Sequence, residues 1–174
     1  MSIVGNSGAG KSTLALALAR RLGVPCVEMD GLNHQPGWTE LTVEELRATI
    51  GPLLDGDGWV VDGNYRDRIG DLVRRRADTV WLDLPRPVVM ARVVRRTVRR
   101  ALTRAELWNG NREPWSNLWS RDPQRSIIAW SWTQHAGYRR RYEAEMSDPA
   151  TGHVHYVRLR SPRAVRRWLA SVGE

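Results

Sequence analysis

A glycine-rich stretch near the amino terminus constrains this chain more than any other feature. Residues 5–12 read Gly-Asn-Ser-Gly-Ala-Gly-Lys-Ser and match G-x-x-x-x-G-K-[ST], the pattern of a phosphate-binding loop, or P-loop. The apolar pair Ile3-Val4 precedes it, and a Leu- and Ala-rich run that ends at Gly23 follows it. The context is therefore strand, loop and helix. Four fixed positions with these flanks are rare by chance, which favours a P-loop over a glycine-rich turn before an ordinary helix.

The P-loop predicts a site for a nucleoside triphosphate. Its glycines allow main-chain N–H groups to turn inward around the phosphates, and the helix that begins near Lys11 adds the positive end of its dipole. We expect Lys11 to reach the β- and γ-phosphates and Ser12 to bind Mg²⁺, so ATP and Mg²⁺ are the expected cofactors. The expected nucleotide-binding residues of the loop are Gly5, Asn6, Ser7, Gly8, Ala9, Gly10, Lys11, Ser12 and Thr13.

Basic residues are distributed unusually in this chain. Lysine and arginine together number 27, and Lys11 is the sole lysine. Such a bias is typical of a genome's composition, yet the exception falls where a compact ammonium is needed beside phosphates. The net charge of +8 favours polyanionic partners: nucleotides, phosphorylated metabolites or nucleic acid.

Length and composition predict a single globular domain over residues 1–174, with an apolar content of 41%. No apolar run approaches the ~20 residues of a membrane span, and none has the pattern of a signal peptide. We therefore expect a cytoplasmic protein without a membrane partner. The one cysteine, Cys26, excludes a disulfide framework or a cysteine-based metal site.

The order of apolar runs predicts an α/β fold. Candidate strands lie at 3–4, 24–29, 59–65, 79–84 and 154–159, with helical patterns between them. This order predicts a five-stranded parallel sheet covered by helices on both faces. Ligand sites in such sheets lie at the carboxyl edge of the strands.

Three aspartates follow candidate strands at that edge. Asp30 is a candidate to hold or deprotonate a phosphoryl acceptor, or else it begins an Asp-Gly turn. Asp62 is a candidate carboxylate for Mg²⁺, with an Asp-Gly turn again as the alternative. Asp83 is a second candidate for the metal carboxylate. The following loop around His34 and residues 36–38 is either part of an acceptor pocket or a surface connection.

Two helices carry further signals. Thr42 to Glu45 predict a capping box, ahead of a helix whose apolar face is Leu46, Ile50 and Leu53. The helix after Pro85 carries two stripes. Its apolar stripe is Met90, Val94, Val98 and Ala101, and its arginine stripe is Arg92, Arg95, Arg96 and Arg99. The arginine face is either simply solvated or turned toward an anion that relieves the repulsion.

Residues 103–122 lack periodicity and are rich in tryptophan, asparagine and arginine, which predicts a functional lid. A helix is expected to start at Asp122-Pro123 and to reach about Met146, so the Arg/Trp-rich helical lid insertion is expected over about 103–147. We expect the tryptophans to pack mostly in the core.

These segments resemble a known group, the bacterial P-loop proteins described as DNA topology modulation proteins, which are adenylate-kinase-like. The segments that carry the resemblance are 5–13, 29–32, 36–38, 59–65, 81–86, 106–113 and 159–163. The likeness thus covers nearly the whole chain. The combination of Pro36-Gly37-Trp38 with Asp62-Gly63-Asn64-Tyr65 is more specific than the P-loop, which many families share.

The resemblance implies roles for matching residues. Asp30 matches the acceptor-side aspartate of shikimate and nucleotide kinases, and Asp62-Gly63 resembles the metal-supporting Asp-Gly of adenylate kinases. The catalytic residues so implied are Lys11, Asp30, Asp62, Arg96 and Arg112, with Ser12 and Asp62 at the metal. The resemblance also implies that Arg92, Arg96 and Arg112 close on the phosphates, and that Arg160 to Pro162 lie beside the adenine. Asn64-Tyr65-Arg66 replaces the Phe-Pro-Arg of adenylate kinases, which argues against AMP as the acceptor.

Two functions fit these expectations. The first is Mg²⁺-dependent transfer of the γ-phosphoryl group of ATP to an unidentified small acceptor, either a nucleotide or a metabolite, because a P-loop, a metal and arginines provide positioning and charge neutralisation. The alternative is a nucleic-acid-binding ATPase linked to DNA topology, in which arginines contact phosphates and tryptophans stack on bases.

Overall fold

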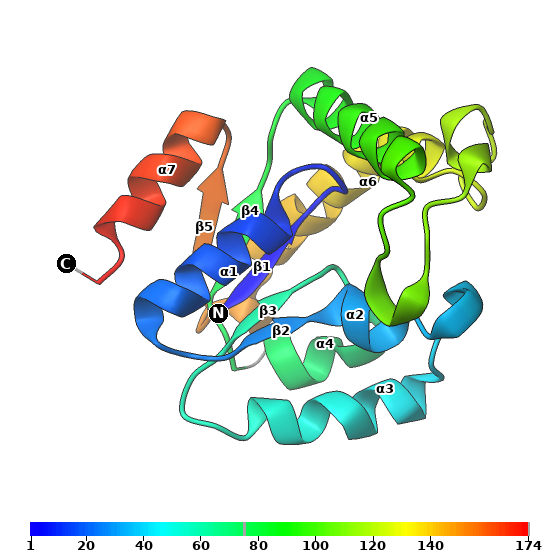
Figure 1. The fold of residues 1–174 in the computed structure, drawn as a ribbon. Helices are drawn as coiled ribbons and strands as arrows, with labels where there is room; N and C mark the ends of the chain where they lie inside the picture. The colour runs from blue at the N-terminus through cyan, green and yellow to red at the C-terminus, as the bar shows by residue number, and fades with distance from the viewer. Residues whose placement is uncertain (75, 174) are drawn as a thin grey trace.

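A computed structural model describes residues 1–74 and 76–173, and within them the chain forms a five-stranded parallel sheet with helices on both faces (Figure 1). The strands are β1 (Ser2–Gly5), β2 (Cys26–Glu28), β3 (Val60–Asp62), β4 (Thr79–Leu82) and β5 (Tyr156–Leu159). Their order in the sheet is β2-β3-β1-β4-β5, and each neighbouring pair is parallel. The predicted fold class is confirmed. Because β1 lies between β3 and β4, its carboxyl end is the point where the strand order reverses, the usual place for a ligand in such sheets.

Helices and short helical turns connect the strands. The α-helices are α1 (Lys11–Leu22), α2 (Met29–Asn33), α3 (Val43–Ile50), α4 (Arg66–Arg74), α5 (Arg86–Thr103), α6 (Ile127–Ser147) and α7 (Pro162–Ser171). The 3-10 turns are η1 (Pro36–Trp38), η2 (Gly51–Leu54), η3 (Trp108–Gly110), η4 (Trp115–Leu118) and η5 (Pro149–Thr151). Among the helices of the described residues, none combines the length and the apolarity that crossing a bilayer requires.

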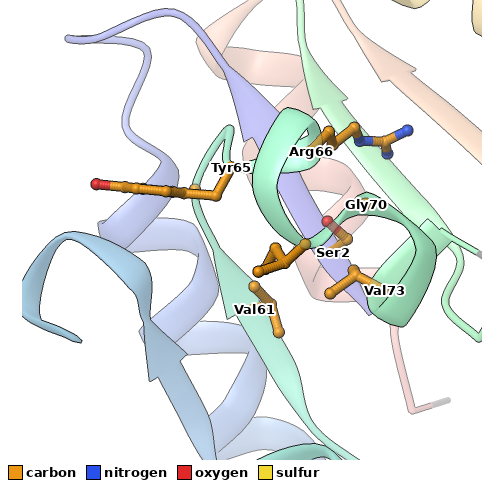
Figure 2. Close-up of a pocket in the computed structure, with 8 residues that line it drawn as sticks. Ser2, Val61, Tyr65, Arg66, Gly70 and Val73 are labelled. Carbon is orange, nitrogen blue, oxygen red and sulfur yellow. The ribbon is translucent and has the colours of Figure 1, made fainter. Parts of the chain in front are cut away.

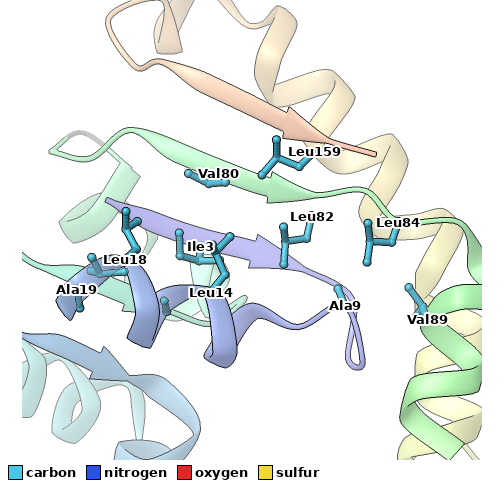
Figure 3. Packing of buried hydrophobic residues seen from close by; sticks show 12 residues of the cluster. Ile3, Ala9, Leu14, Leu18, Ala19, Val80, Leu82, Leu84, Val89 and Leu159 are labelled. Carbon is cyan, nitrogen blue, oxygen red and sulfur yellow. The ribbon is translucent and has the colours of Figure 1, made fainter. Parts of the chain in front are cut away.

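Alternation along the strands divides the core between the two faces of the sheet. On one face, Ile3, Val80, Leu82 and Leu159 pack against α1 (Figure 3). Helix α7 adds partly buried apolar residues to the same cluster, among them Trp168. Residues one position along the same strands point the other way, as expected for a period of two.

The opposite face holds two smaller clusters. Val61 packs with Leu46 and Ile50 of α3 and with Ile69 of α4. Closer to β4, the fully buried Val4, Trp81 and Tyr142 form a second cluster, in which Tyr142 belongs to α6. Helix α6 is therefore part of the body of the fold.

The predicted capping box is present at the start of α3. The Thr42 main-chain N–H donates to Glu45 Oε2 at 2.8 Å, and the Glu45 N–H donates to Thr42 Oγ1 at 3.2 Å. Leu46 and Ile50 are buried as expected, but Leu53 is wrong as a member of this face, since it is 44% exposed. The reason is that α3 ends at Ile50 and Gly51–Leu54 form a 3-10 turn, which changes the period.

The structure corrects the apolar face of α5. The predicted stripe is wrong at Val94 and Val98, which are exposed, and right at Ala101, which is buried. The buried positions are Val89, Val93, Thr97 and Ala101. A Cβ on Gly8 of the P-loop would lie 2.7 Å from the Val89 oxygen and 3.1 Å from Val93 Cβ, so this face is fixed by close contact with the P-loop.

The helix expected at Asp122-Pro123 begins later. Ser126 caps α6 by accepting a 3.3 Å hydrogen bond from the Ala129 N–H, whereas Asp122 accepts one from the Gln124 N–H in a preceding turn. Since α6 has buried residues at Ser131, His135 and Tyr142, the segment discussed below as a candidate lid is limited to residues 104–126.

The expectation that tryptophans pack mostly in the core is wrong for the candidate lid and for the first turns of α6. Trp59 and Trp81 are buried, but Trp119 is 69% exposed. The other exposed tryptophans are Trp38, Trp115, Trp130 and Trp132. Most of them belong to the lid and to the first turns of α6.

The two faces of α3–η2 give a test of this packing. Replacing Ile50, which has no exposed surface, with alanine is expected to lower the free energy of unfolding by about 2–4 kcal/mol, since it leaves a cavity. Leu53→Ala is expected to change it by less than about 1 kcal/mol. Urea unfolding followed by circular dichroism measures both, and equal losses would contradict the assigned face.

Candidate nucleotide and acceptor site

The P-loop curves around the carboxyl end of β1. Gly8 and Gly10 have φ angles of 84° and 99°, in the region that favours glycine, and Gly10 is the N-cap of α1. Because the first residues of α1 direct their N–H groups into this loop, the positive end of the helix dipole faces the same space. The conformation suits a polyanion.

Three cationic side chains surround the loop. Lys11 Nζ donates to the Asn6 oxygen at 3.3 Å, Arg92 Nη1 to the Ala9 oxygen at 3.1 Å, and Arg96 Nη2 to Ser7 Oγ at 3.0 Å. Their partners in these bonds are neutral oxygens. The predicted direction of Arg92 and Arg96 toward the P-loop agrees with this geometry.

The charges of Lys11 and Arg96 are poorly compensated. Burial lowers the pKa of Lys11, and the nearby Asp62 and Asp30 oppose this only in part. Burial and the neighbouring Arg100 lower the pKa of Arg96. Arg96 Nε is also buried without a hydrogen-bond partner. A bound anion would supply what both cations lack.

Asp62 fits the role expected of a metal carboxylate. It is 4% exposed, and its Oδ1 is buried without a hydrogen-bond partner. Burial raises the pKa of Asp62, while Lys11 and the Ser12 hydroxyl oppose that shift. An orphaned carboxylate oxygen beside the Ser12 hydroxyl is a donor set that Mg²⁺ accepts together with phosphate oxygens.

Asp83 does not fit that role. Its Oδ1 accepts from Arg139 Nη2 at 2.8 Å and its Oδ2 from Arg158 Nη2 at 2.7 Å, so both oxygens are engaged by guanidinium groups. Asp83, the second candidate for the metal carboxylate, is therefore wrong for that role. Its carboxylate instead binds the guanidinium groups of Arg139 and Arg158.

Asp30 lies in the first turn of α2, so the alternative of an Asp-Gly turn is wrong at this position. Tyr65 donates its hydroxyl hydrogen to Asp30 Oδ1 at 2.9 Å. The negative charge of Asp30 acts to raise the pKa values of Lys11, Asp62 and Arg96. The structure thus brings four of the five predicted catalytic residues close enough together to influence one another's charge.

The remaining predicted residues lie farther out. Arg112 is an exposed residue of the lid, where its main-chain oxygen accepts from Trp38 Nε1 at 3.1 Å. Arg160 is exposed in the connection after β5, with Nε 3.7 Å from Asp83 Oδ2, and Pro162 is the first residue of α7. Thr13 is exposed on α1. Their proposed contacts with nucleotide stay predictions.

Residues 106–112 of the candidate lid are joined to residues 31–38 by a set of hydrogen bonds, which we call the clasp. Asn109 Nδ2 donates to the His34 oxygen at 2.6 Å and Asn111 Nδ2 to the Gln35 oxygen at 2.9 Å. The Trp38 N–H donates to Asn111 Oδ1 at 2.9 Å. Trp108 covers Gly31, where a Cβ would lie 2.8 Å from the Trp108 ring.

Several residues that support the P-loop were missed by the sequence analysis. Asn64 accepts from the Gly5 N–H at 3.0 Å and donates to the Gly5 oxygen at 2.6 Å. Tyr142 of α6 donates to Asn64 Oδ1 at 3.0 Å. Ser131 Oγ donates to the Ser7 oxygen at 3.0 Å, and Asn6 Nδ2 donates to the Ser131 oxygen at 2.7 Å. The Asp-Gly-Asn-Tyr motif was the available signal for Asn64 and Tyr65, whereas the residues of α6 carry none.

Comparisons with known proteins match parts of this chain. The family model described as "ATPase family associated with various cellular activities (AAA)" matches residues 1–53. A shikimate kinase of Rhodopseudomonas palustris is 31% identical over 117 residues, which are 58% of this chain and 57% of that protein. The chain therefore matches little more than half the length of this relative.

The fold also occurs in a solved structure. The shikimate kinase of Bacteroides thetaiotaomicron superimposes with a TM-score of 0.54 at 18% identity, covering 97% of this chain and 93% of that one. A gluconokinase of Sinorhizobium meliloti 1021 gives a TM-score of 0.49 at 22% identity, covering 97% and 90%. The chain therefore contains a P-loop and shares the fold of the Bacteroides thetaiotaomicron shikimate kinase.

Two adjacent arginines of α5 test the charge at the site. Arg96→Ala is expected to weaken Mg²⁺-ATP binding about tenfold or more, because it removes a charged donor beside the P-loop. Arg95→Ala, on the exposed side of the same helix, is expected to stay within about twofold of the unchanged protein. Isothermal titration calorimetry compares them, and equal affinities would contradict the placement of Arg96.

Proposed function

We propose that this chain is an ATP-dependent kinase, which transfers the γ-phosphoryl group of ATP to a hydroxyl of a small acceptor. One observation carries the proposal: at the carboxyl edge, two under-compensated cations, Lys11 and Arg96, meet two carboxylates, Asp30 and Asp62. A P-loop protein that only bound or hydrolysed nucleotide would not require Asp30 as a second carboxylate in addition to Asp62.

Each group has a separate role in the proposed reaction. The oxygen of the acceptor hydroxyl bonds to the γ-phosphorus as the bond from that phosphorus to its bridging oxygen breaks, and ADP leaves. Asp30 takes the proton of the hydroxyl. Lys11 and Arg96 stabilise the charge that develops on the transferred group and on the bridging oxygen.

Ser12 and Asp62 are the residues that would hold Mg²⁺. When bound, the ion neutralises phosphate charge and orients the β- and γ-phosphates. The orphaned Asp62 Oδ1 supports this assignment.

We further propose that residues 104–126 act as a lid. The clasp brings Trp108 and Asn109 directly over the turn of α2 that contains Asp30. Exclusion of water from this space would favour the acceptor over hydrolysis. Arg112 is carried on the same segment and would approach the phosphates when the lid closes on them.

The relatives guide the choice of acceptors. One of them is named a shikimate kinase, so shikimate is the first compound to test, followed by sugar acids, sugars, nucleosides and nucleoside monophosphates. The motif likeness described above also supports placing the chain among the proteins described as DNA topology modulation proteins.

Incubation with ATP, Mg²⁺ and this panel is expected to yield one new phosphorylated product by mass spectrometry. Lys11→Ala is expected to abolish it, since the ammonium at the β- and γ-phosphates is lost. Chelation of Mg²⁺ should do the same. Formation of ADP and free phosphate alone, with every acceptor, would contradict the kinase proposal.

The same assay tests whether the lid excludes water. Asn111→Ala removes two hydrogen bonds of the clasp. If the lid excludes water, this variant should form more free phosphate for each molecule of phosphorylated product than the unchanged protein does. Asn117→Ala, within the lid but outside the clasp, is the comparison.

A second candidate function is a nucleic-acid-binding ATPase. The exposed Trp115, Trp119 and Trp132 support it, since aromatic side chains beside arginines stack on bases, and Arg86 lies over the Trp132 ring at 4.8 Å. Titration of labelled single-stranded DNA at several salt concentrations should give a steep salt dependence if this is correct. Negligible binding at moderate salt would exclude it.

A further inference from the structure

Tyr65 connects the end of β3 to the acceptor side of the site. It is adjacent in sequence to Arg66, but Figure 2 shows the two side chains extending in opposite directions from the start of α4. Arg66 bonds to Thr79 Oγ1 at 2.8 Å and pairs with Glu145, beside a pocket of only about 10 Å³ lined in part by Ser2 and Val73. Tyr65 instead reaches Asp30.

The phenol of Tyr65 is a permanent donor. Burial raises the pKa of Tyr65 well above its ordinary value, and the charge of Asp30 raises it further. The hydroxyl therefore keeps its hydrogen throughout the physiological range of pH. Its bond to Asp30 Oδ1 fixes the rotation of the carboxylate and leaves Oδ2 as the oxygen that Tyr65 does not occupy.

The loop that carries Tyr65 is held firmly against the P-loop. Gly63 has a φ of 144°, and a Cβ there would lie 2.8 Å from Met29 Cβ, so the loop packs closely against the first residue of α2. Asn64 bonds to both the N–H and the oxygen of Gly5. Tyr65 thus holds Asp30 from a base that is fixed relative to the nucleotide site.

The other charged groups that face Asp30 are Lys11 of α1, Asp62 of β3 and Arg96 of α5. They act on Asp30 through their charge, which has little directional preference. The hydrogen bond from Tyr65 is directional, so it distinguishes the two oxygens of Asp30.

We propose that Tyr65 is a positioning residue, whose hydroxyl orients Asp30 so that Oδ2 receives the proton of the attacking hydroxyl. This role rests on the proposed kinase function. As that proton moves to Oδ2, the attacking oxygen bonds to the γ-phosphorus and the bond to the bridging oxygen of ADP breaks. The orientation of Asp30 itself is measurable without turnover.

The first measurement uses protein labelled with ¹³C at the aspartate Cγ. The Asp30 resonance is assigned by its loss in Asp30→Asn. Tyr65→Phe removes only the hydroxyl and is expected to move this resonance. Tyr156→Phe is the matched control. Tyr156 donates to another carboxylate, with its hydroxyl 3.4 Å from Glu145 Oε2, and this pair lies outside the site. The control should therefore leave the Asp30 resonance in place.

The second measurement is steady-state turnover of Mg²⁺-ATP with water as the acceptor. Tyr65→Phe is expected to lower kcat about tenfold and to leave the KM for ATP within about twofold, since the nucleotide contacts are unchanged. Tyr156→Phe should retain the kcat of the unchanged protein. Equal losses in the two variants would overturn the positioning role, because a merely structural hydroxyl would behave in that way.

An Asp30 resonance that Tyr65→Phe leaves unmoved would also overturn the proposal. If that variant does not fold, Asp30→Asn provides the reciprocal reading, in which the tyrosine ¹³Cζ resonance of Tyr65 must move. A moved resonance in a protein that turns over no ATP, either with water or with any compound of the acceptor panel, would contradict the kinase function while supporting the orientation of Asp30, so the two failures are distinguishable.

Discussion

Uncompensated positive charge at the end of β1 is the constraint on which this site depends. Lys11 and Arg96 are held by neutral oxygens of the P-loop, and burial lowers the pKa of each. Removing cations from water without a full counter-charge costs free energy, which the rest of the fold must offset. Asp30 and Asp62 supply part of the compensation through their charge. A polyanion would supply the remainder, so binding of a nucleotide is coupled to the stability of the folded chain.

The end of β3 organises what surrounds that charge. β3 lies beside β1 in the sheet, so the four residues that follow one another from Asp62 to Tyr65 are beside the P-loop. Asp62 has a buried carboxylate oxygen without a hydrogen-bond partner, where we propose that Mg²⁺ binds, and Gly63 permits the close approach of Met29. Asn64 continues the hydrogen bonding of β1 at Gly5, and Tyr65 reaches Asp30. The short loop from Asp62 to Tyr65 therefore connects the proposed metal position, the P-loop and Asp30.

Local pattern was sufficient to predict the strands, the P-loop and the capping box at Thr42, because each depends on residues close in sequence. It was insufficient where two local solutions compete. Helix α5 carries valines at 88, 89, 93, 94 and 98, so two neighbouring stripes are both apolar, and only the contact of Val89 and Val93 with Gly8 selects between them. Similarly, Asp122 and Ser126 are both good caps, and the later one is used because Ser126 Oγ also donates to the Asn117 oxygen. Contacts such as that between Tyr65 and Asp30 join residues 35 positions apart, and neither residue type alone predicts its partner.

The two attachments of the region after α5 differ in a way that bears on motion. Helix α6 bonds to the P-loop directly through Ser131 and to Asn64, beside the P-loop, through Tyr142. Both residues are buried, so breaking those bonds would leave polar groups unsatisfied. The clasp has two kinds of contact. The exposed amide of Asn109 donates to main-chain oxygens, and water can replace these bonds at little net cost. Asn111, in contrast, is 4% exposed and bonds to the Trp38 N–H and the Gln35 oxygen. Residues with positive φ also gather there: Trp38 at 61°, Arg104 at 49° and Asn109 at 55°. Such conformations store strain, most of all for a bulky side chain such as Trp38. If the site opens, the Asn109 contacts are therefore the part of the clasp that separates at the lowest free-energy cost, and the buried Asn111 contacts oppose the separation more strongly, while α6 stays on the sheet.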